Sequence, residues 1–324
     1  RRFQRLNRAE YANVIRDLLA LYVDAGRWLP ADTYLGNFDN MSDAQGLSVT
    51  LMEAYLRAAT EVSRMAMGNP GALSASSKYT NPIEVSQHAW DRLEGAPYGT
   101  RGGIVVTHDF PADGSYVFSL ETLFGRGTSF EDVDLSIDGE GVALLALEHN
   151  GGSSVPIRTE PISVAAGQHR VAAVFVRKND GPYEDRLSPF AWSFVGGEDS
   201  QAWANYGITA LPHVADLMIT GPVRTTGVSE TPSRREVFTC TPATPAEERP
   251  CAESIVERLL SKAYRRPVTA ADVAGPMSFF DAGAAEDGFE VGVRTALQAI
   301  LADPEFMFRF ERTPPGVAAG ASHR

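Results

Sequence analysis

The feature that most constrains the fold is a change in the spacing of apolar residues along the chain. The spacing is helical in 8–22 and again in 255–302. Between these regions, after 68–71, short runs rich in Val, Ile and aromatic residues alternate with polar residues. One alternating region between two helical ones predicts a multidomain α+β protein. Its antiparallel β-sandwich, of jelly-roll type, is flanked by N- and C-terminal helical segments.

The N-terminal helical segment is predicted over residues 1–70. Asn7 and Glu10 have the spacing of a capping box, and the apolar residues that follow predict a helix over 8–22. Ser48 is expected to cap a second helix. The residues between the two helices are rich in Gly, Asn and Asp, which is typical of a loop.

The β-sandwich is predicted over residues 80–200, because short runs of β-branched and aromatic residues recur there at intervals of about 8–12 residues. Asp138-Gly139 has the composition of a tight hairpin turn. The runs expected to form strands are 104–107, 114–122, 133–137, 142–147, 155–162 and 170–177.

The C-terminal part is predicted to begin with an extended connector over 201–251, since Pro, Gly and Thr are frequent there and no periodicity is visible. A helical segment is expected over 252–313, with a capping signal at Thr269 and Asp272. The small polar residues of 314–324 predict a flexible tail.

The only two cysteines, Cys240 and Cys251, suit a disulfide, because ten residues rich in Pro, Thr and Ala separate them. A disulfide would place the protein in an oxidising compartment, so we expect a periplasmic or otherwise exported protein. Two free thiols in a cytosolic protein are the alternative. Neither cysteine belongs to a C-x-x-C motif, which excludes covalent c-type haem and thioredoxin-like chemistry on this chain.

Charge and hydropathy argue against nucleic acid as a partner and against a membrane-spanning helix. The formal net charge of -12 opposes attraction to phosphate backbones, and no basic cluster with interleaved aromatic residues offsets it, so nucleic acid is not expected. The longest apolar stretches, around 142–147 and 171–176, are far shorter than a membrane-spanning helix. We therefore expect the chain to have no transmembrane segment of its own, so any location at a membrane would be peripheral to it.

Several motifs occur in a fixed order along the chain. They are Leu6–Tyr11, Phe38–Asn40, Phe110–Tyr116, Ala263–Val268 and Asp303–Phe306. Together they resemble large planctomycete-type secreted proteins, whose domains of unknown function often accompany cytochrome c modules. Those relatives continue past their equivalent of 310–312 into further domains, whereas this sequence ends at Arg324, so we expect a shortened relative or a fragment.

The resemblance implies a setting among cytochrome c domains, and the sequence shows no catalytic or cofactor motif. We therefore expect no enzyme, but a non-enzymatic accessory subunit. It would dock on the periplasmic side of a larger membrane-bound or cytochrome-containing electron-transfer complex, with cytochrome c among its candidate partners. The polar residues expected to anchor the helical segments are Asp39, Tyr264, Arg265 and Arg266. An active site around the first three is the enzymatic alternative.

The segments Tyr116–Leu120, Val133–Gly139 and Val164–His169 resemble jelly-roll carbohydrate-binding modules. A binding module of an exported polysaccharide-degrading system is therefore the alternative function. Sugar recognition needs exposed aromatic rings, whereas the structural interpretation is that these rings seal interfaces. The candidate aromatic residues are Trp90, Tyr98, Phe124, Tyr183, Trp192 and Trp203.

Calcium is the only cofactor that the sequence suggests. Glu131, Asp132 and Asp134 lie beside a predicted strand and carry the oxygen ligands that calcium prefers. A solvated acidic edge is the alternative. Strand alternation places Asp132 and Asp134 on one face and Glu131 on the other, so the three carboxylates are not expected to converge without a loop.

Overall fold

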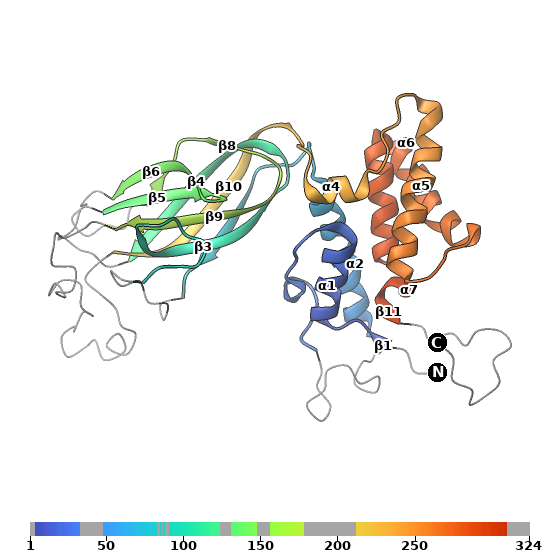
Figure 1. The fold of residues 1–324 in the computed structure, drawn as a ribbon, viewed down its shortest axis with the longest axis horizontal. Coiled ribbons are helices and arrows are strands. Elements are labelled where there is room, and N and C mark those ends of the chain that lie inside the picture. Colours follow the sequence, from blue (N-terminus) through green and yellow to red (C-terminus); the bar gives the residue numbers. More distant parts are fainter. Residues whose placement is uncertain are drawn as a thin grey trace. The chain divides into compact units, whose positions relative to one another are not determined.

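The computed structural model describes residues 4–32, 48–82, 85, 87, 91–123, 131–147, 156–177 and 212–309. The chain divides into two compact units (Figure 1). The helical unit consists of Arg1–Met67 and Glu230–Arg324, and the sandwich unit of Gly68–Ser229. The predicted fold class, an antiparallel β-sandwich flanked by helical segments, is confirmed. The two helical segments belong to one unit, into which the sandwich is inserted.

The N-terminal half of the helical unit begins with the predicted capping box. The side chain of Asn7 accepts a hydrogen bond from the Glu10 amide at 2.8 Å, and Glu10 Oε2 accepts one from the Asn7 amide at 3.0 Å. Helix α1 ends earlier than predicted because Ala20 adopts a left-handed conformation with φ 49°. The elements of this half are β1 (Gln4–Arg5), α1 (Arg8–Leu19), η1 (Ala25–Arg27) and α2 (Val49–Met67).

The C-terminal half also follows its capping signals. Thr269 and Asp272 form a capping box at the start of α6. Asp287 and Gly288 interrupt this helix with non-helical dihedral angles. Strand β11 pairs antiparallel with β1, so the ends of the two halves meet. The elements are α4 (Pro232–Val237), α5 (Pro245–Tyr264), α6 (Ala270–Leu301), α7 (Pro304–Met307) and β11 (Phe308–Arg309).

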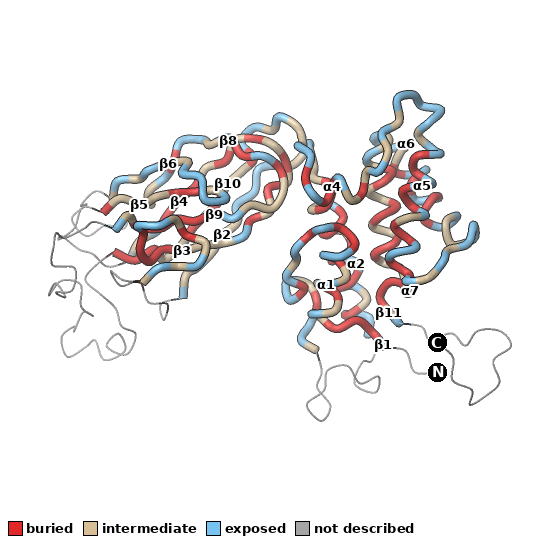
Figure 2. Tube along the Cα trace, viewed as in Figure 1, coloured by how far each residue is buried: buried red, intermediate tan, exposed pale blue. Residues whose placement is uncertain are grey.

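One apolar core holds the two halves together (Figure 2). The ring of Tyr11 lies 5.8 Å from that of Tyr55 and 6.0 Å from that of Phe306, centroid to centroid, and all three side chains are buried. Helix α2 packs against α6, and α1 packs against α5. The buried surface of each half is therefore formed against the other half.

The sandwich unit consists of two antiparallel sheets. The first has the order β2-β10-β4-β7, with β8 also on β4, and the second has the order β3-β9-β5-β6. The strands of the first sheet are β2 (Ala75–Thr80), β10 (His213–Gly227), β4 (Asp113–Leu123), β7 (Ile157–Arg158) and β8 (Ile162–Val164). Those of the second are β3 (Thr100–Phe110), β9 (Gly167–Val176), β5 (Glu131–Ile137) and β6 (Glu140–Leu147).

Strand alternation directs one side chain in two into the sandwich core. Phe110, Phe118 and Phe175 are buried there between the sheets. At the β5–β6 turn, Asp138 and Gly139 both have positive φ angles, 52° and 87°. This is the conformation that the predicted two-residue hairpin requires.

The prediction of an extended connector over 201–251 is wrong for much of that range. Residues 213–227 form β10, which runs between β2 and β4, and α4 and α5 both begin before residue 251. Alternation in β10 is hidden by Gly221 and Pro222, because the pairing with β4 shifts register between Thr220 and Arg224. The predicted strand over 155–162 is instead divided between β7 and β8. The tail, 314–324, lies outside the described residues.

Arg234 fastens three elements of the helical unit. Its guanidinium donates to the Met67 carbonyl at 2.7 Å and forms two hydrogen bonds with the Glu290 carboxylate at 2.7 and 3.1 Å. The guanidinium carbon also lies 4.9 Å from the centroid of the Phe238 ring. Helices α2, α4 and α6 are thus joined through a single buried side chain.

Substitution Arg234→Ala is expected to lower the free energy of unfolding of the helical unit by about 2 kcal/mol, because it leaves the buried Met67 carbonyl without this donor. The measurement is urea unfolding of the full chain, followed by helical circular dichroism. The neighbouring Arg235 is exposed, so Arg235→Ala is the matched control and should leave the transition unchanged. Equal effects of the two substitutions would contradict this role.

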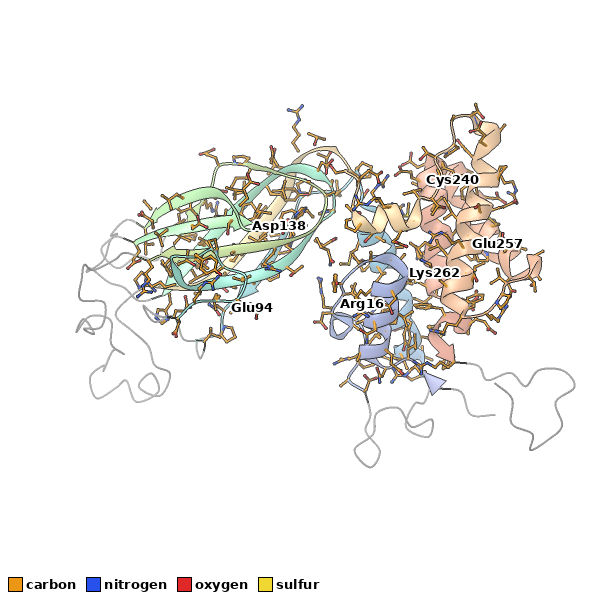
Figure 3. The ribbon with its side chains drawn as sticks, in the orientation of Figure 1. Arg16, Glu94, Asp138, Cys240, Glu257 and Lys262 are labelled. Carbon is orange, nitrogen blue, oxygen red and sulfur yellow. A yellow bond between two sulfur atoms is a disulfide. The ribbon has the colours of Figure 1, made fainter. Side chains whose placement is uncertain are left out.

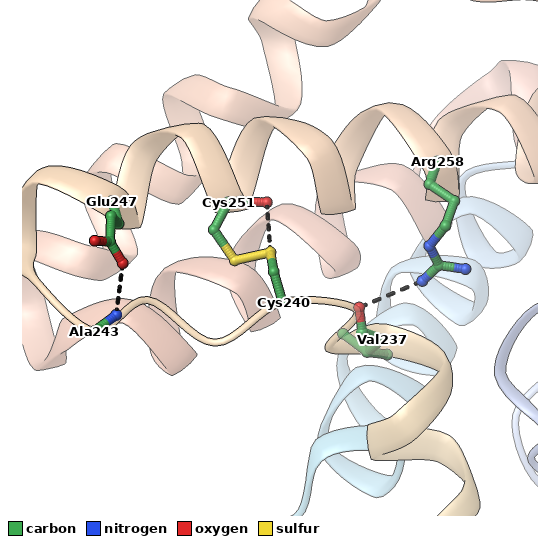
Figure 4. Close-up of a disulfide and its surroundings, with 6 residues drawn as sticks. All are labelled: Val237, Cys240, Ala243, Glu247, Cys251 and Arg258. Atoms are coloured by element: carbon green, nitrogen blue, oxygen red, sulfur yellow. Dashed lines mark hydrogen bonds between the residues drawn. A yellow bond between two sulfur atoms is a disulfide. The ribbon is translucent and has the colours of Figure 1, made fainter.

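The predicted disulfide between Cys240 and Cys251 is present (Figure 4). It holds the segment after α4 against α5, and the Glu247 side chain accepts a hydrogen bond from the Ala243 amide on the same segment at 2.9 Å. The backbone that leads from α4 into α5 is therefore fixed at two points.

Removal of the disulfide by Cys240→Ser together with Cys251→Ser is expected to cost about 2–3 kcal/mol of unfolding free energy, because the short loop regains freedom in the unfolded chain. Thermal or urea unfolding with and without dithiothreitol measures it. The reductant should lower the stability of the wild type to that of the double variant. A wild type insensitive to reductant would refute the expectation.

Candidate functional site

A loop formed by residues 91–99 lies against the outer surface of the four-stranded sheet, and we call it the Tyr98 loop. Its residue Ala96 packs against Ala172 and Val174 of β9. The neighbouring Ala173 belongs to the sandwich core, so alternation places Ala172 and Val174 on the outer surface. Figure 3 marks this loop by Glu94 and the β5–β6 turn by Asp138.

Tyr98 presents an aromatic ring to solvent. Its side chain is 89% exposed, and the Arg92 guanidinium carbon lies 4.2 Å from the centroid of its ring. Arg92 is itself held by a hydrogen bond of 3.0 Å from Nη2 to the Ala96 carbonyl. The ring is thus supported by a cation–π contact while most of its surface remains open to solvent.

Two polar side chains of β5 lie on the same outer surface. Asp134 pairs with Val174 and Ser136 with Ala172, the two β9 residues beneath the Tyr98 loop. Ser136 is fully buried, and its Oγ has no hydrogen-bond partner among the described residues. The Oδ1 atom of Asp134 is also buried and has no hydrogen-bond partner among the described residues. Buried polar atoms are usually hydrogen-bonded, so these two atoms are exceptions within the described part of the chain.

Glu131 has a different environment from Asp134. Its carboxylate is buried and lies 3.4 Å from the Arg101 guanidinium. The guanidinium carbon of Arg101 lies 4.4 Å from the centroid of the Phe175 ring. Burial lowers the pKa of Arg101, whereas the charge of Glu131 raises it. Glu131 is therefore part of an interior ion pair, and the three proposed calcium ligands do not converge. Within the described chain, no group of three or more His, Cys, Asp or Glu residues is arranged to hold a metal ion.

Asp138 and His169 form a tight contact at the end of the same sheet. His169 Nδ1 lies 2.6 Å from Asp138 Oδ2, and Asp138 Oδ1 accepts a hydrogen bond from the Arg170 amide at 2.8 Å. Burial acts to raise the pKa of Asp138, but these hydrogen bonds lower it below its ordinary value. The arrangement anchors the β5–β6 turn to β9.

Tyr264, Arg265 and Arg266 fasten the turn between α5 and α6. Arg265 donates to the Phe306 carbonyl at 3.2 Å, and Arg266 binds the Asp272 carboxylate at 2.8 and 3.0 Å. Burial, together with the nearby Asp303 carboxylate, raises the pKa of Tyr264. These contacts lie within the C-terminal half of the helical unit.

Six of the proposed site residues lie outside the described residues, so the structure neither groups nor separates them. They are Asp39, Trp90, Phe124, Tyr183, Trp192 and Trp203. The sequence interpretation also missed Arg92 and Ser136. Arg92 carries no local signal, because its contact depends on the path of the loop. Ser136 could have been found, since it continues the alternation of Asp132 and Asp134.

Two segments of the chain match families of unknown function. Residues 4–68 match the protein of unknown function DUF1587, and residues 251–311 match the protein of unknown function DUF1595. Both segments lie in the helical unit, one in each half. The two matched segments therefore fold here as parts of one unit. A comparison with curated proteins gives no match.

Solved structures similar to the chain include several carbohydrate-associated domains. The CBM36-1 domain of a multidomain xylanase from the hindgut metagenome of Trinervitermes trinervoides is 18% identical, with a TM-score of 0.25, over 40% of this chain and 77% of that one. CBM35 from Cellvibrio japonicus Abf62 is 15% identical, with a TM-score of 0.26, over 48% and 100%. Such low scores carry no argument about function. None of the described helices combines the length and apolar character that crossing a bilayer requires.

The hydrogen bond from Arg266, followed by those from Thr269, lowers the pKa of Asp272. Because its pKa is lower in the folded state, the ionised carboxylate stabilises the fold at pH values above the unfolded pKa of about 3.9. This stabilisation is lost as the pH falls below that value toward the folded-state pKa. Asp272→Asn should therefore lower stability at neutral pH, by about 1 kcal/mol for a partly exposed ion pair and cap.

The test is unfolding of the wild type and Asp272→Asn between neutral and acidic pH. The difference between them should be constant above about pH 5 and shrink below about pH 4. Asp287 is exposed at the interruption of the same helix, and Asp287→Asn is the control. A difference that persists unchanged into acid would contradict the electrostatic cause.

Proposed function

We propose that the protein is a non-enzymatic, exported binding protein whose sandwich unit binds carbohydrate. The binding surface consists of Tyr98 and Arg92 on the Tyr98 loop, both of which are exposed. The observation that carries the proposal is that Tyr98 is 89% exposed while a guanidinium holds its ring. An aromatic ring kept in the open by a specific contact is suited to bind the apolar face of a ligand.

The chemistry of the surface fits a sugar. A sugar ring offers an apolar face of C–H groups, which can stack on tyrosine, and a rim of hydroxyl groups. The exposed Arg92 guanidinium can donate hydrogen bonds to the hydroxyl oxygens. An apolar platform beside a few polar groups is the usual construction of a small-ligand site.

Two further features bear on the setting of the protein. The disulfide between Cys240 and Cys251 supports an oxidising, exported location. The alternative role is that of an accessory subunit on a membrane-bound or cytochrome-containing electron-transfer complex. It stays a prediction from the resemblance to secreted planctomycete-type proteins, because the matched segments belong to families of unknown function. Carbohydrate binding is preferred because a specific surface supports it.

Substitution Tyr98→Ala is expected to weaken binding to polysaccharide about tenfold or more, the loss typical of a central aromatic contact. Affinity electrophoresis in gels containing xylan, β-glucan or pectin would identify the ligand, and calorimetry with its oligosaccharide would measure the affinity. Tyr98→Phe should retain most of the binding because the ring remains.

The matched control is Phe279→Ala, which removes a half-exposed aromatic ring from α6 in the helical unit. It should bind like the wild type. The proposal fails if the wild type binds no polysaccharide, or if Tyr98→Ala binds as tightly as the wild type.

A further inference from the structure

Strand β6 (Glu140–Leu147) is an open edge of the four-stranded sheet. The sheet order β3-β9-β5-β6 gives it one neighbour, β5, and no described strand pairs with its other side. In an antiparallel sheet about half of the backbone N–H and C=O groups of an edge strand point away from its neighbour. An eight-residue edge of this kind is a ready template for another strand.

The other described edges carry features that discourage pairing. Strands β7 and β8 are only two and three residues long, and β2 carries the exposed Lys78. Strand β3 is irregular, with a register shift between Arg101 and Ile104. Short length, lysine and bulges are the usual protections of an edge against association.

Strand β6 has only one of these protections, a register shift in its pairing with β5 near its start, and its residues 143–147 pair regularly. Its sequence is Glu-Gly-Val-Ala-Leu-Leu-Ala-Leu, with one charge, Glu140, at its first position. The side chain of Leu144 is 66% exposed in the middle of the strand. A long, apolar and nearly uncharged edge is expected to associate with another strand.

We propose that β6 is a dimerisation edge, which pairs antiparallel with β6 of a second copy of this chain. Around a two-fold axis each copy supplies the same surface, so one strand satisfies both sides of the interface. Antiparallel pairing joins the two four-stranded sheets into one continuous sheet and covers both exposed Leu144 side chains.

The position of the single charged residue of β6 favours a second copy of this chain as the partner of the strand. In an antiparallel pair, Glu140 lies toward the partner's Leu147, so the two carboxylates stand at opposite ends of the ladder. An identical strand therefore brings no like charges together along the apolar middle. The sandwich unit as a whole is acidic, which makes an uncharged strand the segment best able to meet another copy.

The experiment is measurement of the mass of the full chain over a range of concentrations by light scattering and sedimentation, using wild type, Leu144→Lys and Ala146→Lys. Lysine at either position adds the protection that the edge lacks. Leu144 lies opposite Asp134 and Ala146 opposite Asp132 on β5, so each lysine gains a cross-strand carboxylate and the fold should survive. Thermal unfolding checks this.

The wild type should be a dimer at micromolar concentration and dissociate on dilution, whereas both lysine variants should remain monomeric. Leu73→Lys changes another highly exposed leucine away from β6 and should leave the dimer intact. Hydrogen exchange of the β6 amides should slow as the wild type dimerises. A wild type that stays monomeric at the highest attainable concentration, or lysine variants that dimerise as well as it does, would overturn the proposal. Protection, in the monomer, of the β6 amides that point away from β5 would do the same, since this chain would then cover its own edge.

Discussion

The structure depends on an apolar core that neither end of the chain can form alone. Tyr11 and Tyr55 come from the N-terminal half and Phe306 from the C-terminal half, and their rings meet in the interior of the helical unit. Because burial of apolar surface is the main favourable contribution to folding, the two halves have to fold together. The sandwich must therefore leave and re-enter the helical unit at neighbouring points. Arg234, which follows the sandwich in sequence, binds the carbonyl of Met67, which precedes it.

The same dependence gives a physical meaning to the two family matches. Segments 4–68 and 251–311 are matched separately, yet they share one core. The pairing of β1 with β11 closes this unit at its ends. The two matched segments are complementary parts of one unit, and the sandwich lies between them in the sequence.

In the sandwich, the alternation of strand β5 separates side chains that face the core from side chains on the outer face of the sheet. Glu131 turns inward to an ion pair with Arg101, whereas Asp134 and Ser136 turn outward beneath the Tyr98 loop. The outer side of the sheet thereby carries the exposed Tyr98 with its supporting guanidinium, whereas Asp134 Oδ1 and Ser136 Oγ are buried. Among the described strands, the neighbouring β6 is an edge of the same sheet. A dimer formed through that edge would carry two copies of the surface, and two linked sites bind a polymer more tightly than one.

Local signals in the sequence determined the parts of this protein whose structure depends on nearby residues. The capping boxes at Asn7 and Thr269, the turn at Asp138-Gly139 and most of the strands follow from short-range spacing, as does the alternation that divides Glu131 from Asp134. The pairing of Cys240 with Cys251 was also accessible, because no other cysteine is present. Only the tertiary structure decided that β10 crosses the sandwich, since Gly221 and Pro222 conceal its alternation, and that Arg92 supports Tyr98. It also decided which helices share a core and which strand remains at an edge. These outcomes depend on contacts between residues far apart in the chain. Local spacing does not determine which distant residues a side chain contacts.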